Sequence, residues 1–297
     1  MNNFTTCEYK NINGCSIKCD VYSGATGAPV LVYIHGGALI FGGRGDMPEA
    51  AVKPFMDSGY WVVSIDYRLA PETKLPSIIG DVRDALDWVR GEGCRAFGYD
   101  AGKMAVAGGS AGGYLTLMAG TFETKPNALV SFYGYGDILG DWYSKPSPYY
   151  CTMPLIPQED AQKLVLGHEL SEAGYPGRFA IYLHARQTGT WAGLASGYDV
   201  DAEREKIKQY CPIYNIYENY PPTMLLHGDQ DTDVPYQQSL DMYNALNKHG
   251  LAAELATYAG GGHGFDNDKQ DVKVPPLVEK ALLFVKAHME KENDETD

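Results

Sequence analysis

The sequence predicts an α/β protein in which a doubly wound, mostly parallel sheet carries an inserted helical cap. Short runs of apolar and β-branched residues alternate along the chain with longer amphipathic runs, as strands and crossover helices do. Several of the short runs are apolar throughout, which is typical of strands covered on both faces. One long segment, residues 137–211, interrupts the alternation and contains no convincing central strand.

The composition is that of a soluble globular protein, and it disfavours some classes of partner. Hydrophobic residues make up 44% of the 297 residues and charged residues 21%. The formal net charge of -14 would repel nucleic acids and anionic membrane surfaces, so we expect neither as a partner. No stretch approaches the roughly 20 apolar residues that span a bilayer, and the N-terminus does not resemble a signal peptide. These features favour a cytoplasmic protein and leave a homodimer open.

The cysteines give no sign of a disulfide framework or a metal site. The six are scattered along the chain, at Cys7, Cys15, Cys19, Cys94, Cys151 and Cys211. A chain of this length needs no covalent staples, so we expect buried free thiols in a cytosolic protein. Cys15 and Cys19 have no second Cys or His pair at zinc-finger spacing, and we therefore predict no metal site.

Seven apolar, β-branched runs are predicted strands. They are Ile17–Tyr22, Val30–Ile34, Trp61–Asp66, Met104–Gly108, Ala128–Tyr133, Thr223–His227 and Ala253–Tyr258. Four runs with helical patterns are predicted helices: residues 77–93, Ala111–Thr121, Tyr236–His249 and Val274–Glu290. Gly91 and Gly93 are predicted to end the first helix.

The segment at residues 137–211 is rich in Tyr, Trp and Pro. A stretch of this length between two predicted strands indicates an inserted subdomain or a lid, with a decorated helical crossover as the alternative. We therefore divide the chain into the N-terminal part of a core at residues 1–136, a cap insertion at 137–211, and the C-terminal part of the core at 212–297.

A candidate nucleophile lies between a predicted strand and a predicted helix. Gly108–Gly112 reads G-x-S-x-G with Ser110 at its centre. A serine raised on a tight strand-to-helix turn has strained backbone angles and needs small neighbours. The helix start points N–H groups, including that of Ala111, at developing negative charge. The alternative is a Gly-rich turn with an incidental serine.

A serine hydroxyl needs a base to take its proton and an acid to orient that base. His263, in the Gly-rich loop "GGGHGF" after a predicted strand, is the candidate base. The run "LLHGDQDTDVP" offers Asp229, Asp231 and Asp233 as the acid. We favour Asp231, because it lies about one turn beyond the end of the predicted strand. We expect the other two to be solvated turn residues.

The loop "IHGGALIFGG" follows another predicted strand and is the candidate oxyanion hole. Gly-rich backbone exposes N–H groups closely enough to stabilise the oxyanion of a tetrahedral intermediate. We assign this role to Gly37 and Ala38, together with Ala111. A positive φ at Ala38 would cost about 1–3 kcal/mol of strain, and the alternative for the whole loop is a plain tight turn.

With these residues in place, the chain resembles the α/β-hydrolases, and most closely the hormone-sensitive-lipase-like carboxylesterases. The resemblance rests on His35–Ala38, "DYRLAPE" at Asp66–Glu72, Gly108–Gly113, the loop around Asp231, and "HGF" at His263. It implies hydrolysis of small carboxylic esters without a cofactor, through an acyl intermediate on Ser110. It also implies that "DYRLAPE" is structural, its arginine anchoring loops near the oxyanion strand.

Three functions remain open at this stage. The leading hypothesis is a serine esterase that cleaves short or medium acyl esters, or acetyl esters, of a small-molecule substrate. The second is an amidase or peptidase on the same fold, similar to an arylformamidase or a prolyl oligopeptidase. The third is a non-catalytic small-molecule binding protein that has kept the fold.

Overall fold

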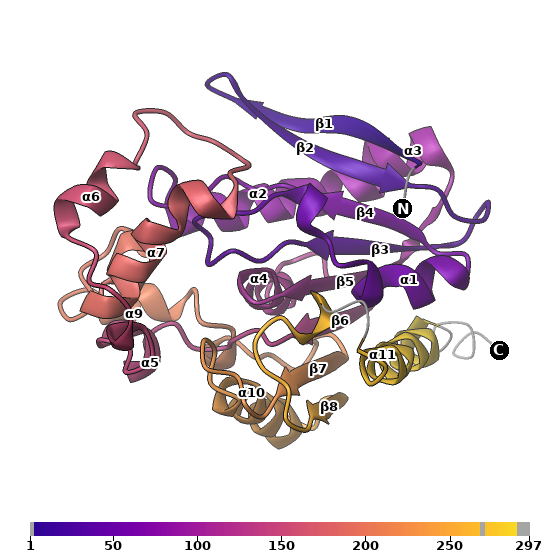
Figure 1. The fold of residues 1–297 in the computed structure, drawn as a ribbon. Helices are drawn as coiled ribbons and strands as arrows, with labels where there is room; N and C mark the ends of the chain where they lie inside the picture. Colours follow the sequence, from indigo (N-terminus) through magenta and orange to yellow (C-terminus); the bar gives the residue numbers. More distant parts are fainter. Residues whose placement is uncertain (1–2, 268–270, 290–297) are drawn as a thin grey trace.

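Eight strands form a single, mostly parallel sheet in the computed structural model, which describes residues 3–267 and 271–289 (Figure 1). The strands are β1 (Phe4–Ile12), β2 (Cys15–Tyr22), β3 (Pro29–Ile34), β4 (Trp61–Ile65), β5 (Asp100–Gly109), β6 (Ala128–Phe132), β7 (Thr223–Gly228) and β8 (Ala253–Tyr258). Their spatial order is β1-β2-β4-β3-β5-β6-β7-β8. β1 and β2 pair antiparallel with their neighbours, and the strands from β4 to β8 run parallel. The predicted fold class is confirmed.

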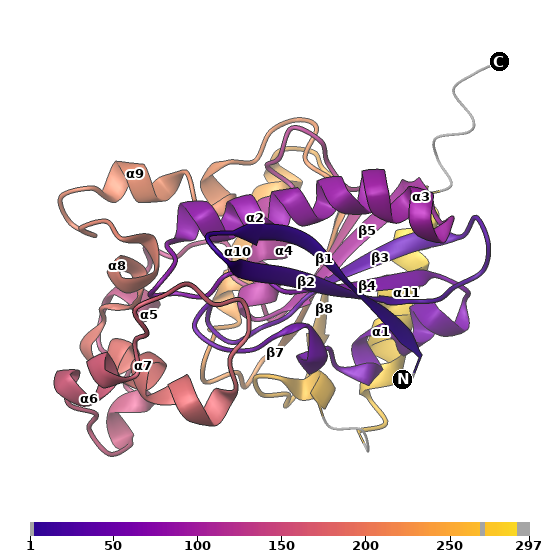
Figure 2. The same ribbon diagram turned by 90° about the horizontal axis from the view of Figure 1, so that it is seen from above.

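Helices cover both faces of the sheet (Figure 2). They are α1 (Glu49–Asp57), α2 (Leu75–Trp88), α3 (Cys94–Phe97), α4 (Ala111–Ala119), α10 (Gln237–Lys248) and α11 (Val274–Met289). A π-helical turn spans Val89–Gly93, and short 3-10 helices span Arg44–Asp46, Tyr150–Thr152, Pro212–Tyr214 and Phe265–Asn267. α1 and α11 pack on one face, and α2, α4 and α10 pack on the other.

β3 shows why the central strands are apolar throughout. Val30 and Val32 belong to the core under α2 and α4, whereas Leu31 and Tyr33 belong to the core under α1 and α11. All four side chains are essentially inaccessible to solvent. Because successive residues of a strand point to opposite faces, a strand covered on both sides has no position that faces solvent.

In the core, the strand β1 and the helix α1 were not predicted, because neither has the pattern of the other elements. β1 is an edge strand whose residues are mostly exposed or half-buried, so it has no buried apolar run. α1 contains Pro54, which lowers its helix propensity, and it is held by burial of Ala51, Val52 and Phe55. In both cases packing decides a structure that local sequence does not favour.

The predicted end of the first helix at Gly91 and Gly93 is wrong. The helix continues through the π-helical turn into α3 and ends at Gly98, whose φ of 79° forms a left-handed cap. A side chain at Gly93 would meet the ring of Trp88 at 2.8 Å and the hydroxyl of Tyr99 at 2.3 Å. Gly93 is therefore required by close packing rather than by helix termination.

The segment between β6 and β7 contains five helices, and none of the eight strands comes from it. These helices are α5 (Asp141–Ser144), α6 (Gln158–Lys163), α7 (Tyr175–Thr188), α8 (Trp191–Ser196) and α9 (Arg204–Lys208). They lie together at one end of the sheet in Figures 1 and 2. We call residues 137–211 the cap. The division of the chain at these bounds stays a prediction.

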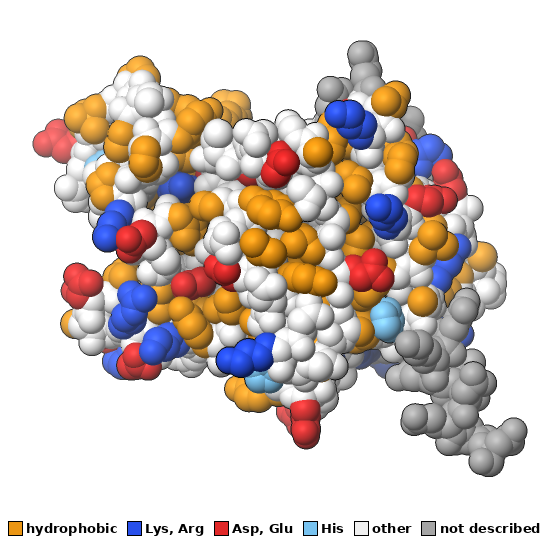
Figure 3. Space-filling view, turned by 90° about the horizontal axis from the view of Figure 1, so that it is seen from below, with side chains coloured by type: hydrophobic (Ala, Val, Ile, Leu, Met, Phe, Trp, Pro, Cys, Tyr) orange, Lys and Arg blue, Asp and Glu red, His pale blue; other side chains and the backbone are white. Residues whose placement is uncertain are grey.

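Charged side chains of both signs lie on the surface (Figure 3), and the thiols agree only partly with expectation. In Figure 3, acidic and basic side chains are interspersed over the face shown instead of forming one charged patch. All six cysteines are free, but only Cys19 and Cys211 are buried and Cys151 is exposed, so the expectation of buried thiols is wrong for Cys151.

Among the described residues, no helix combines the length and the apolar character that crossing a membrane requires.

Candidate active site

Ser110 lies at a sharp turn between β5 and α4. Its backbone angles, φ 56° and ψ -119°, fall where non-glycine residues are strained. A Cβ on Gly108 would lie 2.7 Å from the carbonyl oxygen of Ile34, and one on Gly112 would lie 2.0 Å from the same atom. The glycines around Ser110 are therefore needed because this turn packs directly against the end of β3.

The structure brings the three predicted catalytic residues together. Nε2 of His263 lies 3.0 Å from Oγ of Ser110, and Nδ1 lies 2.7 Å from Oδ2 of Asp231. Asp231 is held in turn, because its Oδ1 accepts hydrogen bonds from the backbone N–H groups of Asp233 and Val234 at 2.8 and 2.9 Å. With its proton on Nδ1, His263 donates to Asp231 and can accept the serine proton on Nε2.

The three candidate acids have different environments. Asp229 is exposed and accepts a hydrogen bond from the N–H of Gly260 at 2.7 Å, as expected of a turn residue. Asp231 is the one that meets Nδ1 of His263, and its side chain is fully buried. Asp233 differs from expectation: its side chain is only 16% exposed, and it pairs with Arg186 from the cap at 2.7 Å.

The loop of His263 is fastened to the end of β6. Tyr133 donates a hydrogen bond of 2.6 Å to Oδ1 of the buried Asp266, and the Tyr133 and His263 ring centroids lie 4.8 Å apart, with a steep angle between the planes. Burial raises the pKa of Asp266 to about 6, against the opposing effect of the Tyr133 hydrogen bond. The Tyr133 ring thus packs edge-on against the imidazole and helps to hold it in place.

The charges around the triad shift both titrating groups. Burial alone would raise the pKa of Asp231, but hydrogen bonds from His227 and His263 hold it well below its ordinary value. Burial alone would lower the pKa of His263, but the carboxylates of Asp233, Asp231 and Asp266 raise it above its ordinary value of 6.5. The site therefore favours a charged imidazole, as proton transfer from a serine requires.

The predicted oxyanion loop forms a turn with three successive positive φ angles. They are 100° at Gly37, 55° at Ala38 and 64° at Leu39. Gly37 cannot be replaced without moving the backbone, because its Cβ would lie 1.9 Å from the carbonyl oxygen of Phe41. The φ of Ala38 is positive, so its methyl group costs about 1–3 kcal/mol of backbone strain. Gly37 and Ala38 line the same pocket as Ser110, whereas Ala111 is buried and is not among the residues that line it. The donor role of all three stays a prediction.

The cap holds this strained turn in place. Arg178 of α7 donates from Nε to the carbonyl oxygen of Ile40 at 2.7 Å, and Trp191 of α8 donates to that of Ala38 at 3.0 Å. The guanidinium of Arg178 also binds both carboxylate oxygens of Glu72, at 2.9 and 2.6 Å. Arg68 of "DYRLAPE" instead pairs with Asp81 and with Glu169 of the cap. The arginine that anchors the turn at residues 37–39 is therefore Arg178.

Replacing Arg178 with methionine is expected to lower the free energy of unfolding by about 3–5 kcal/mol, because the buried charge of Glu72 would lose its cationic partner. The side chains of Arg178 and Glu72 are only 5% and 3% exposed. Urea unfolding followed by circular dichroism measures the change. The double variant with Glu72→Gln should recover part of the loss, and an unchanged midpoint in the single variant would contradict the assignment.

Sequence analysis did not identify the cap residues that reach the site, although α7 carries a signal. Arg178, Tyr182 and Arg186 recur every four residues, so they share one face of the helix. All three are buried. Two arginines on the buried face of a helix require acceptors from the core, and here these are Glu72 and Asp233.

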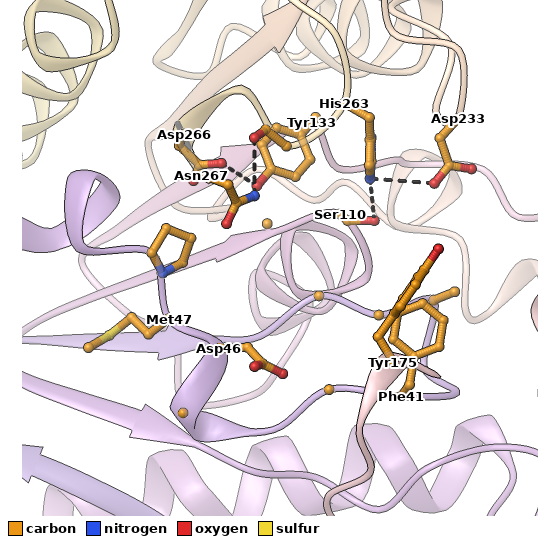
Figure 4. A pocket seen from close by; sticks show the side chains of 18 of the residues that line it. Phe41, Asp46, Met47, Ser110, Tyr133, Tyr175, Asp233, His263, Asp266 and Asn267 are labelled. Carbon is orange, nitrogen blue, oxygen red and sulfur yellow. Dashed lines mark hydrogen bonds and ion pairs between the residues drawn. The ribbon is translucent and has the colours of Figure 1, made fainter. Parts of the chain in front are cut away.

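Ser110 and His263 open into a cavity of about 1100 Å³ between the core and the cap (Figure 4). Its lining includes ten Phe and Tyr residues and five Asp and Glu residues, and no Lys or Arg is found among the described residues that line it. Figure 4 shows Ser110 and Asp233 both at the same nitrogen of His263, with Phe41 and Tyr175 below them. A cavity of this size and composition suits an uncharged or cationic small molecule.

The sequence is similar to two families of known proteins and to an esterase. Residues 19–144 match the BD-FAE family, and residues 182–292 match the prolyl oligopeptidase family. Esterase LipC of Mycobacterium tuberculosis is 28% identical over 256 residues, which are 80% of this chain and 53% of that protein. The non-reducing polyketide synthase trt4 of Aspergillus terreus is also 28% identical, over 88% of this chain and 13% of the synthase. The chain thus spans about half of the esterase and about an eighth of the synthase.

Solved structures share the fold over nearly the whole chain. A Staphylococcus aureus protein of unknown function superposes with a TM-score of 0.77 and 23% identity, covering 96% of this chain and 99% of that one. An α/β-hydrolase superfamily protein from Enterococcus faecalis gives a TM-score of 0.74 and 21% identity, covering 97% and 100%. An esterase from Pyrobaculum calidifontis gives 0.70 and 23%, covering 97% and 86%.

Proposed function

This chain is an α/β-hydrolase similar to carboxylesterases, and from that premise we propose that it is a serine esterase that cleaves small carboxylic esters. One observation carries the proposal: Asp231, His263 and Ser110 form a continuous hydrogen-bonded chain that ends in a cavity. A carboxylate, an imidazole and a hydroxyl in this order make the hydroxyl a nucleophile for acyl transfer.

The geometry supports a two-step reaction. In the first step, Oγ of Ser110 bonds to the ester carbonyl carbon while Nε2 of His263 takes the hydroxyl proton. The tetrahedral oxyanion then collapses, the bond to the alcohol oxygen breaks, and Nε2 returns the proton to that oxygen. In the second step, a water molecule gives a proton to Nε2 of His263 and bonds to the acyl carbon. The bond between that carbon and Oγ of Ser110 then breaks, His263 returns the proton to Oγ, and the acid leaves. Asp231 keeps the imidazole in the required tautomer and stabilises its charged form.

A series of 4-nitrophenyl esters, from acetate to longer acyl chains, tests the proposal. We expect turnover of the short and medium esters and covalent labelling of Ser110 by a fluorophosphonate probe. A folded protein that neither turns over any ester nor labels would favour the non-catalytic binding protein and overturn the assignment.

A second candidate is an amidase or peptidase, favoured by the match of residues 182–292 to the prolyl oligopeptidase family. That match includes both Asp231 and His263, which esterases and peptidases of this fold use in the same way. Comparing kcat/KM for an ester with that for its matching 4-nitroanilide separates the two. We expect the ester to be cleaved faster, and faster turnover of the anilide would favour the second candidate.

The pH dependence of kcat/KM should follow the titration of His263. Only the neutral imidazole accepts the serine proton, so activity falls as the pH decreases through a pKa that lies above 6.5. The groups that face this imidazole are Asp231, Asp233, Asp266 and Tyr133. Asp233→Asn removes one negative charge, so it should lower this pKa and move the acid limb to more acidic pH. An acid limb that does not move would contradict this electrostatic account.

We further propose a cytoplasmic protein whose partner is a small-molecule ester, with a homodimer as one oligomeric state to be tested. The six free thiols support a reducing compartment. Size-exclusion chromatography with light scattering determines the oligomeric state.

A further inference from the structure

A second carboxylate faces the catalytic imidazole. Oδ2 of Asp233 lies 3.5 Å from Nε2 of His263, the same nitrogen that is 3.0 Å from Oγ of Ser110 (Figure 4). Asp233 also lines the cavity next to Ser110. Asp231, by contrast, contacts Nδ1 on the opposite side of the ring. Two carboxylates thus approach the ring nitrogens of His263, and the triad accounts only for Asp231.

Asp233 is held in this orientation by the cap. Its Oδ1 accepts a hydrogen bond from Nη1 of Arg186 at 2.7 Å and another from the hydroxyl of Tyr182 at 2.5 Å. Both terminal nitrogens of Arg186 also donate to the backbone carbonyl of Asp233, at 3.3 and 3.2 Å. The cap therefore fixes Oδ1 and leaves Oδ2 directed at Nε2 of His263.

Arg186 is itself immobilised, which makes Asp233 a rigid acceptor. Its side chain is 3% exposed. The guanidinium carbon lies 4.7–5.6 Å from the centroids of four aromatic rings, those of Trp142, Tyr143, Tyr150 and Tyr182. Tyr150, which lines the same cavity, also interacts with the carboxylate of Asp233. A carboxylate offers about four acceptor positions, so the donors from the cap leave it capacity for a further hydrogen bond.

The position of Oδ2 bears on the alcohol part of the substrate. To receive its proton, the leaving oxygen must come within about 3 Å of Nε2 of His263. Because Oδ2 is 3.5 Å from that nitrogen, the carbon next to the leaving oxygen comes within reach of Asp233. A hydroxyl on the following carbon of the alcohol, as in an ester of a 1,2-diol, would donate to the carboxylate, whereas a methyl there would desolvate the carboxylate without a hydrogen bond.

We propose that Asp233 is a specificity-determining residue that selects esters of 1,2-diols and larger polyols, by accepting a hydrogen bond from the hydroxyl next to the ester bond. This inference rests on the proposed esterase function. The lining agrees with an uncharged polyol, because carboxylates accept hydroxyl hydrogens and aromatic rings cover the apolar faces of such molecules. A negatively charged alcohol would be repelled by the same carboxylates.

The test compares two esters that differ only at this hydroxyl, 2-hydroxyethyl butyrate and propyl butyrate. We expect the wild-type protein to prefer the 2-hydroxyethyl ester at least tenfold in kcat/KM, as for a hydrogen bond to a charged acceptor. Asp233→Asn should reduce this ratio severalfold, because an amide NH₂ offers the hydroxyl only a weaker, neutral hydrogen bond. The amide oxygen of the new asparagine can accept the hydrogen bonds from Arg186 and Tyr182. Its NH₂ group, which cannot accept a hydrogen bond, then faces the leaving group. Asp229→Asn, the same change in the same loop, should leave the ratio as in the wild type.

The outcomes separate this inference from the esterase proposal. If the wild type cleaves no ester, the esterase function fails. If the wild type cleaves both butyrates with equal kcat/KM, only the role of Asp233 is overturned, and this measurement needs no variant to fold. A ratio that stays high in Asp233→Asn, with thermal unfolding like the wild type, would overturn it as well.

Discussion

Replacing Ser110 with alanine is expected to reduce kcat for 4-nitrophenyl esters by roughly 10⁴- to 10⁶-fold, because it removes the atom that attacks the ester. The residual rate would come from substrate binding and from backbone donors near the oxyanion. Alanine keeps the Cβ of serine and adds no atom to the turn, so the strained backbone at φ 56° should be retained. Steady-state kinetics and fluorophosphonate labelling measure the effect, with thermal unfolding to verify the fold.

The matched control is Ser77→Ala, an exposed serine on α2. It should retain wild-type turnover and labelling. If Ser110→Ala kept more than about a tenth of the wild-type kcat, far above the residual rate that loss of a catalytic serine leaves, Ser110 would not be the nucleophile. The esterase assignment in its present form would then be lost.

Replacing Asp231 with asparagine is expected to reduce kcat by roughly 10⁴-fold while the geometry is preserved. Oδ1 of Asp231 accepts from two backbone N–H groups, and the amide oxygen of asparagine would take that place. Its NH₂ group would then face Nδ1 of His263, which must accept instead of donate. The imidazole proton moves to Nε2, and that nitrogen can no longer take the proton of Ser110.

The comparison that isolates Asp231 uses its neighbour on the same loop. Asp229→Asn changes an exposed acid whose one contact to the histidine loop, with the N–H of Gly260, survives as a hydrogen bond to the amide oxygen. Its kcat for 4-nitrophenyl esters should stay near that of the wild type. Equal losses in the two variants would mean that the loop, and not the carboxylate at Nδ1, carries the effect.

Much of the site could be predicted from the sequence because its signals are local. Ser110 is marked by glycines that a tight strand-to-helix turn requires, and His263 and Asp231 each follow a buried strand. Parallel strands bring their carboxyl ends to one edge of a sheet, so three residues far apart in the chain are expected to meet. Predicting the strands was therefore enough to predict the encounter.

Sequence alone determined the α/β class, seven of the eight strands, and which serine, histidine and aspartate meet at one edge of the sheet. Only the tertiary structure decided that Arg178 supports the oxyanion turn and that Arg186 directs Asp233 at the catalytic imidazole. It also decided the edge strand β1 and the continuation of the helix through Gly93. The physical reason is the same in each case: hydrophobic periodicity and turn residues report burial and local backbone geometry. A buried charge, the pairing of an edge strand and the close packing at a glycine each depend on residues distant in the sequence, which only folding brings near.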